Sequence, residues 1–217
     1  LSEFVNWSRN NYPAEHYYLA IADHGRGTLG VAEDDTNNNA WMTTSEIRFA
    51  LQVATNDGKQ KIDVLHLDAC LMGMEEVAYQ VREYVDYMVA SQNLAYSLFA
   101  YHLYSQNRTE AHNTRGTRGP GLSFYREMVN RIDAITNPRE LAETVANSYF
   151  SDEEMQEFAR TISVLDLSKA DTVQKAVDGL ANALIDNLAA IKNNIRICRY
   201  VTQKLDSRDY YSITDED

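Results

Sequence analysis

The chain has 217 residues, of which 44% are hydrophobic and 24% charged, and its formal net charge is −12. This length allows one large domain with its own core, and the composition is ordinary for a globular protein. The acidic balance argues against nucleic-acid binding, which needs a basic surface, and is compatible with cationic substrates. Two cysteines provide neither a disulfide framework nor a zinc ligand set, and no apolar stretch reaches the ~20 residues that span a bilayer.

The first part of the sequence changes between helical and extended patterns. Residues 2–10 are predicted to form a helix, and residues 17–23 a buried strand. A polar loop is expected over residues 24–42, because this stretch holds three glycines and three consecutive asparagines. A capping-box spacing at residues 43–46 predicts the start of the next helix.

The following segments continue the alternation. Strands are predicted over residues 62–69 and 87–90, with a helix over about residues 71–84 between them. Strands that alternate with helices form βαβ units, whose strands run parallel in one sheet. The sequence therefore predicts an α/β fold with a mostly parallel sheet.

The pattern breaks over residues 91–121, which have the composition of a loop. A loop this long inside a compact domain is usually functional or disordered. Beyond it, a helix is expected over residues 122–135, and Asn137-Pro138 opens another by its cap and first-turn proline. A strand over residues 161–167 and a long helix capped by Ser168 complete the predicted elements.

Two reactive side chains directly follow predicted strands. His24 comes after the strand at residues 17–23, and Cys70 after the strand at residues 62–69. Sites in α/β sheets form beyond the carboxyl ends of the strands, where a cysteine and a histidine can act as nucleophile and base. A helix starting at Cys70 would lower the pKa of its thiol. The alternatives are a buried structural cysteine and a histidine that only caps a loop, while His66, inside a strand, is interpreted as a core histidine.

The neighbours of this pair indicate how a substrate would be held. Gly25 allows close approach to the backbone, and its N–H and that of Cys70 can form an oxyanion hole. Asp68 lies two residues before Cys70, so the two side chains face the same way on an extended chain. Its carboxylate suits a guanidinium group; the alternative is that Asp68 caps the following helix.

Metal sites are a further alternative. Asp34 and Asp35 belong to an acidic run that offers oxygen ligands to a hard cation such as Ca²⁺. The run lacks the spacing of a known calcium loop, so a solvated loop is the simpler interpretation. A metal site made of His24, Asp68 and Cys70 is also conceivable, and no other residues show metal-ligand spacing.

Several segments of the chain together match one known family. They are Tyr12-Pro13-Ala14, Ala22-Asp23-His24-Gly25, Asp34-Asp35, Asp68-Ala69-Cys70-Leu71-Met72-Gly73-Met74-Glu75-Glu76-Val77-Ala78-Tyr79, Asp86-Tyr87-Met88-Val89-Ala90-Ser91 and Thr161-Ile162-Ser163-Val164-Leu165-Asp166-Leu167-Ser168. In these segments the sequence resembles the clostripain-like cysteine peptidases, family C11 of clan CD, which are related to caspases and gingipains. The resemblance covers most of residues 1–92 and 120–190.

This resemblance implies a caspase-like three-layer α/β/α sandwich over residues 1–217, with the family's first strand upstream of Leu1 and a continuation beyond the last residue. It implies a catalytic dyad of His24 and Cys70, and cleavage of peptides or proteins after Arg or Lys with Asp68 in the S1 pocket. Activation by self-cleavage is implied too. No cofactor is expected to be required, although some members depend on Ca²⁺. A secreted or periplasmic bacterial protein is expected.

The residues around the expected insertion, roughly 94–119, offer self-cleavage sites. Arg108, Arg115 and Arg118 are each followed by a small or polar residue, and exposed loops of this composition are preferred places for nicking. The alternative is a surface insertion that is never cut. For the whole chain, two other functions stay open: a catalytically idle caspase-like binding module, against which the presence of both dyad residues argues, and a metal-dependent hydrolase.

Overall fold

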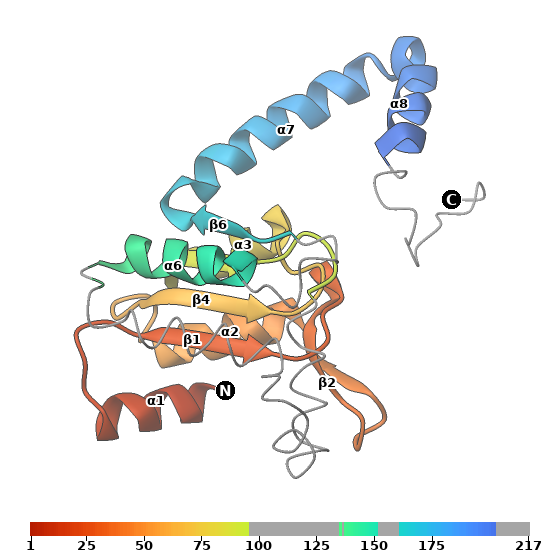
Figure 1. Ribbon diagram of the computed structural model, residues 1–217. Coiled ribbons are helices and arrows are strands. Elements are labelled where there is room, and N and C mark those ends of the chain that lie inside the picture. The colour runs from red at the N-terminus through yellow and green to blue at the C-terminus, as the bar shows by residue number, and fades with distance from the viewer. Residues whose placement is uncertain (96–134, 136, 152–160, 203–217) are drawn as a thin grey trace. The chain divides into compact units, whose positions relative to one another are not determined.

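The computed structural model describes residues 1–95, 135, 137–151 and 161–202 (Figure 1). The chain comprises two compact units, Leu1–Asp171 and Thr172–Asp217. That residues 1–217 form one peptidase domain stays a prediction. No helix in the described ranges is long and apolar enough to cross a membrane.

A four-stranded sheet forms the centre of the first unit (Figure 1). Its strands lie in the order β1 (Tyr18–Ala22), β4 (Ile62–Asp68), β5 (Val85–Ala90) and β6 (Ser163–Asp166). The first three run parallel, and β6 pairs antiparallel with β5. The predicted mostly parallel α/β fold is therefore confirmed, and the carboxyl ends of β1, β4 and β5 share one edge of the sheet.

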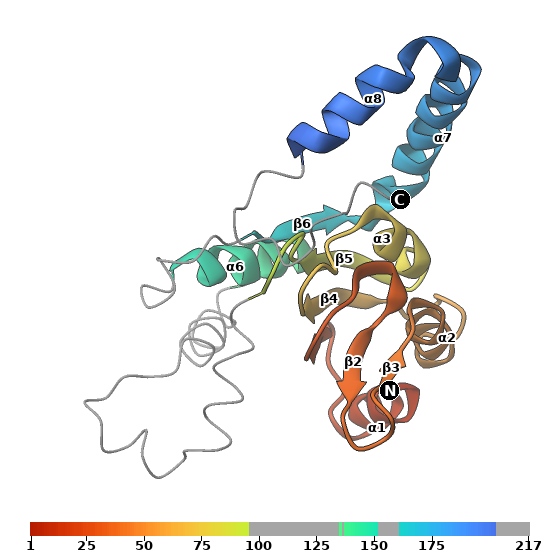
Figure 2. The same ribbon diagram turned by 90° about the vertical axis from the view of Figure 1, so that its right-hand side faces the viewer.

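Helices cover both faces of this sheet (Figure 2). Helices α1 (Ser2–Asn11), α2 (Thr44–Ala54) and α3 (Glu75–Val81) contribute to the larger core cluster on one face. Helix α6 (Pro138–Ser151) packs on the other face through its predicted apolar side chains. These are Leu141, Val145 and Tyr149, packed against Val64 and Val89 of the sheet.

Local signals decide where two of these helices begin. The Thr43 hydroxyl accepts a hydrogen bond from the Glu46 N–H, and the Glu46 carboxylate accepts one from the Thr43 N–H, so α2 opens with the predicted capping box. The Asn137 side-chain oxygen accepts the Glu140 N–H at 2.9 Å and caps α6 in the same way.

The predicted polar loop over residues 24–42 is wrong. It contains a short 3-10 helix, η1 (Gly27–Leu29), and an antiparallel hairpin of β2 (Val31–Asp34) and β3 (Ala40–Met42). Asn38 and Asn39 take left-handed φ angles of 53° and 54° and turn the chain between the strands. The asparagines that indicated a loop therefore form only the hairpin turn.

The predicted helix over residues 71–84 is shorter than expected and begins only at Glu75. Leu71 has a φ of 62°, which a right-handed helix excludes. Gly73 lies so close to the end of β5 that an added Cβ would come within 2.8 Å of the Ser91 carbonyl carbon. Four residues therefore separate Cys70 from the helix.

The end of the described chain also differs from expectation. The Asp166 carboxylate, and not Ser168, is the cap: it accepts the Ser168 N–H at 3.0 Å at the start of η4 (Leu167–Lys169). The long helix then divides into α7 (Ala170–Asp186) and α8 (Leu188–Thr202). Between them, the Asn187 side chain donates to the Ala183 carbonyl at 2.8 Å, a contact that ends α7.

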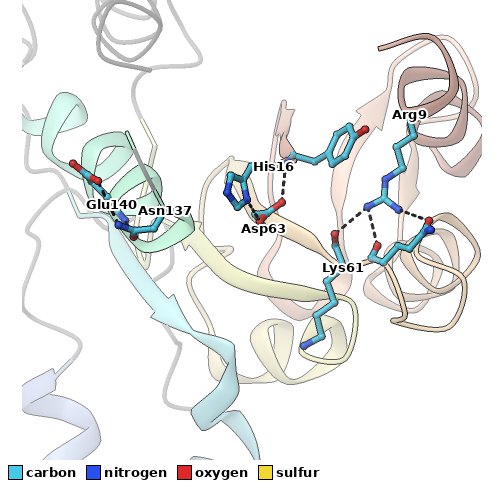
Figure 3. A network of polar contacts seen from close by, with 8 residues as sticks. Arg9, His16, Lys61, Asp63, Asn137 and Glu140 are labelled. Atoms are coloured by element: carbon cyan, nitrogen blue, oxygen red, sulfur yellow. Dashed lines mark hydrogen bonds and ion pairs between the residues drawn. The ribbon is translucent and has the colours of Figure 1, made fainter. Parts of the chain in front are cut away.

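Polar contacts fix the amino-terminal side of the sheet (Figure 3). The Arg9 guanidinium donates to the carbonyl oxygens of Ala54, Gln60 and Lys61 at 3.1, 2.8 and 3.0 Å. These bonds tie α1 to the segment that leads into β4.

A second contact on this side joins the starts of β1 and β4 (Figure 3). The two oxygens of the Asp63 carboxylate contact His16 Nδ1 and the Tyr17 N–H, each at 2.7 Å. His16 and Asp63 are 47 residues apart in the chain, so no local sequence pattern links them.

Candidate active site

The chain segments that carry His24, Asp68 and Cys70 come together at the carboxyl ends of β1 and β4. In the register of β1 and β4, Ala22 pairs with Asp68. His24 and Cys70 therefore each lie two residues beyond a matched pair of strand ends. The expectation that the ends of adjacent parallel strands bring these segments together is met.

Gly25 lies directly against the backbone of Cys70. A Cβ at this position would be 2.1 Å from the Cys70 carbonyl oxygen and 3.0 Å from the Ala69 Cβ, so only glycine fits. Gly25 was expected to let a substrate approach the backbone; in the structure its missing side chain lets the chain itself approach. This contact holds the His24–Gly25 segment beside Cys70.

The backbone around His24 is held on both sides. The His24 N–H donates to the Asp23 carboxylate at 2.6 Å, and the His24 carbonyl accepts the Ala32 N–H at 3.0 Å. The Arg26 N–H donates to the Gly30 carbonyl at 2.9 Å. These two hairpin bonds flank Gly25 without using its N–H, and the side chain of His24 is exposed.

Cys70 is half-buried, and its Sγ accepts a hydrogen bond from the Ala95 N–H at 3.3 Å. Burial raises the pKa of the Cys70 thiol; the Ala95 N–H opposes this rise in part, and the negative charge of Asp68 adds to it. The expected lowering of the thiol pKa by a helix N-terminus is wrong, because α3 begins five residues further on.

The segment that covers Cys70, residues 91–95, is called the β5 strap because it follows β5. Its carbonyls at Ser91 and Asn93 accept the N–H groups of Gly73 at 2.7 Å and Leu71 at 3.0 Å. The Thr161 hydroxyl bonds the strap from the side of β6, 2.9 Å from the Ser91 hydroxyl. Sequence reasoning missed the strap, since these residues carry no catalytic pattern.

Asp68 and His66 lie on the same face of β4 and are both buried, with 3% and 1% of their surfaces exposed. The hydroxyl of Tyr18 on β1 lies 2.7 Å from His66 Nδ1. Burial lowers the pKa of His66, and the charge of Asp68 opposes this shift. The Asp68 charge thus acts on both His66 and Cys70. The interpretation of His66 as a core histidine is confirmed.

Comparison with known proteins places this chain. The family model described as "Clostripain family" (Peptidase_C11) matches residues 1–217. The chain belongs to the clostripain family. The resemblance noted in its sequence is therefore confirmed over the full length.

The chain is 27% identical to clostripain of Hathewaya histolytica over 196 residues. The match covers 83% of this chain and 37% of clostripain. A solved structure of a secreted C11 cysteine protease from Bacteroides thetaiotaomicron, in complex with an irreversible peptide inhibitor, is similar in fold, with a TM-score of 0.56, 23% identity, and 81% of this chain and 46% of that one covered. A second structure of a secreted C11 cysteine protease from Bacteroides thetaiotaomicron gives a TM-score of 0.57 at 16% identity, with coverage of 84% and 47%. The chain thus spans less than half the length of these relatives.

Two further groups of residues were singled out from the sequence: the candidate self-cleavage arginines and the candidate calcium ligands. Arg108, Arg115 and Arg118, and the helix expected over residues 122–135 apart from its last residue, lie outside the described residues. The Asp34 carboxylate accepts hydrogen bonds from the Thr36 N–H and hydroxyl, at 2.9 and 2.7 Å, which lower its pKa.

The structure describes the surroundings of Asp34, one of the two residues considered as calcium ligands. Ca²⁺ takes six to eight oxygen ligands, whereas the Asp34 carboxylate is already bonded to Thr36. Within the described ranges, no group of three or more His, Cys, Asp or Glu side chains is arranged to hold a metal ion. That no cofactor is required stays a prediction, with Ca²⁺ as the alternative.

Proposed function

We propose that this chain carries the catalytic centre of a cysteine endopeptidase that cleaves after Arg or Lys, with His24 and Cys70 as its dyad. One observation carries the proposal. The backbone of Gly25 is pressed against the Cys70 carbonyl, so the segment bearing an exposed histidine is fixed beside a half-buried thiol at the carboxyl edge of a parallel sheet.

The proposed reaction begins with transfer of the Cys70 thiol proton to His24. The Sγ then attacks the scissile carbonyl carbon, and the carbonyl oxygen becomes an oxyanion that the N–H groups of Gly25 and Cys70 stabilise. His24 donates its proton to the leaving amine as the C–N bond breaks. In the second half, His24 takes a proton from water, the hydroxide attacks the thioester, and the proton returns to Cys70.

The electrostatics of Cys70 support a dyad in which the base acts during the reaction. Because burial raises the thiol pKa, the protonated form is favoured in this state of the chain. An adjacent base must then remove the proton when the substrate is in place. His24 is free to serve because its ring is exposed while its backbone is held by Asp23 and Ala32.

Asp68 is the proposed S1 carboxylate. It is buried, lies on the strand that leads to Cys70, and its charge reaches that thiol. A buried carboxylate favours a cationic partner, and a guanidinium can bond both of its oxygens. The alternative role as a helix cap loses its basis, since α3 begins at Glu75 with Met74 at its cap position.

Self-cleavage is proposed within residues 94–119, after Arg108, Arg115 or Arg118. The support is the β5 strap, which bonds Cys70 Sγ through Ala95 and is followed directly in the sequence by residues 96–119. The test is to incubate active protein and Cys70→Ala protein side by side and to map fragments by mass spectrometry. New amino termini at Thr109, Gly116 or Gly119 in the active sample alone support self-cleavage. A chain that stays uncut over residues 94–119 in fully active enzyme overturns it.

The proposed setting is outside the bacterial cytoplasm, as a secreted or periplasmic enzyme that acts on peptides or proteins. The support is that both similar solved structures are of secreted C11 proteases. Secretion is tested by detecting the protein in culture medium or a periplasmic extract of its source.

The function is tested with a positional-scanning library of fluorogenic peptides. We expect much faster turnover of peptides with Arg or Lys at P1 than of all other peptides, insensitivity to chelators, and labelling of Cys70 by an arginine-based acyloxymethyl ketone. Labelling must be absent in Cys70→Ala protein. A folded protein with neither turnover nor labelling is the idle binding module instead, and chelator-sensitive turnover that resists thiol reagents indicates a metal-dependent hydrolase.

A further inference from the structure

A buried polar pair lies behind the proposed S1 carboxylate and is not used by the dyad. Tyr18 and His66 come from adjacent strands, β1 and β4, and their side chains meet at 2.7 Å between the phenol oxygen and Nδ1. The ring centroids are 6.1 Å apart. The pair lies on the sheet face that α6 covers, where Tyr18 packs against the same cluster as Val64.

The strand register puts His66 between the phenol and the carboxylate. Tyr18 pairs with Val64, and Asp68 lies four residues further along β4, at the carboxyl edge. His66 is on the same face, midway between these positions. The residues of β1 opposite His66 and Asp68 are Ala20 and Ala22, whose small side chains leave room on this face for the larger polar groups.

His66 is held in its neutral form next to Asp68. Burial holds its pKa below the ordinary value, so the imidazole is neutral at neutral pH. A neutral imidazole next to Asp68 adds no positive charge there, whereas a protonated one would offset the carboxylate charge and repel a guanidinium. The bond to Tyr18 fixes the orientation of the ring.

We infer that Tyr18 and His66 form a positioning pair beside Asp68, on the same face of the sheet, and that this pair sets how strongly the centre prefers a cationic P1 side chain. The inference rests on the proposed function, because it assigns a role to residues behind the proposed S1 group. Neither residue touches the reacting atoms. Both act on catalysis through Asp68.

The test compares two peptides that differ only at P1, one with arginine and one with citrulline, its uncharged analogue. The variants are Tyr18→Phe, His66→Leu and His66→Gln in the full-length protein. The matched control is Tyr84→Phe, which removes a hydroxyl from a buried tyrosine of the opposite core cluster.

We expect Tyr18→Phe to lower the arginine-to-citrulline ratio of kcat/KM about three- to tenfold, mainly through KM for the arginine peptide, since one hydrogen bond is lost. His66→Leu lowers the ratio further, and His66→Gln restores part of it because its amide can bond Tyr18. Tyr84→Phe leaves the ratio unchanged.

Two results separate this inference from the proposed function. A wild-type enzyme that cleaves both peptides equally overturns the proposed P1 specificity and this inference with it. A wild-type preference for arginine that survives Tyr18→Phe and His66→Leu, or equal losses on both peptides, overturns the positioning role alone. If His66→Leu does not fold, Tyr18→Phe decides by the same ratio.

Discussion

The two ends of the strands in the central sheet, called here the amino edge and the carboxyl edge, carry polar residues with different surroundings. At the amino edge, Asp63 and Arg9 have short hydrogen bonds to fixed neighbours, with both Asp63 oxygens occupied (Figure 3). At the carboxyl edge, His24 is exposed, and the half-buried Cys70 accepts one hydrogen bond from the strap, from the Ala95 N–H at 3.3 Å. The contacts at the amino edge hold the fold, whereas the carboxyl edge carries the two residues of the proposed dyad. Substitutions at the two edges should therefore separate stability from activity.

The largest effect is expected at the carboxyl edge. Cys70→Ala should abolish peptidase activity, and His24→Ala should lower kcat/KM by roughly a thousandfold or more, because residues that act as a unit lose most of their effect when either is removed. Circular dichroism and the melting temperature should stay near wild type in both. Substantial turnover by purified Cys70→Ala protein would contradict the dyad.

Asp68→Asn tests the role of charge at the carboxyl edge, because it removes the negative charge while keeping a side chain of nearly the same size and shape. Breaking a buried ion pair costs about 3–5 kcal/mol, so kcat/KM for an arginine peptide should fall by at least about a hundredfold. The citrulline peptide should lose far less. Equal losses on the two peptides would show that Asp68 is structural.

Gly25→Ala tests whether the contact between the two strand ends is needed. The new Cβ would meet the Cys70 carbonyl oxygen, which is a backbone atom and cannot rotate away. We expect a large loss of activity together with a stability loss of about 1–3 kcal/mol. The control is Gly179→Ala in α7, where nothing lies within 4 Å of an added Cβ and stability should rise by up to about 1 kcal/mol.

Arg9→Met should give the reverse pattern at the amino edge. It removes the hydrogen bonds to three backbone carbonyls, and we expect the free energy of unfolding in urea to fall by about 2 kcal/mol. The kcat and KM of the folded fraction should not change. Arg48→Met, which alters an exposed arginine of α2, is the control, and a change in KM in Arg9→Met alone would contradict the division between the edges.

The smallest effect concerns stability in acid. Because burial lowers the pKa of His66, the unfolded chain binds a proton below about pH 6.5 that the folded chain does not bind. The stability that comes from keeping His66 neutral is fully present above that pH. It is lost as the pH falls from the pKa of His66 in the unfolded chain to its lower pKa in the folded chain. The unfolding free energy of the wild type should decline in this window. His66→Gln should flatten the decline, and an identical slope in both proteins would contradict the assignment.

The sequence by itself determined the local elements of this protein. Apolar runs fixed β1, β4 and β5, because a buried parallel strand needs side chains that pack on both faces. The spacing of Thr43 and Glu46 fixed the start of α2, and the apolar period of α6 fixed its buried face. The Asp68–Tyr79 motif was enough to indicate the family, which the match over residues 1–217 confirmed.

Only the tertiary structure decided what surrounds Cys70. The start of α3 at Glu75, the pressure of Gly25 on the Cys70 carbonyl and the bond from Ala95 all depend on segments 18 to 45 residues apart meeting at one edge. Helix propensity at residues 71–74 gave way to bonds with the β5 strap. The pKa of the Cys70 thiol is raised and not lowered, because burial, a property of the packed chain, raises it and α3 begins only at Glu75. Local sequence patterns carry no information about such contacts, which exist only once the strands are in register.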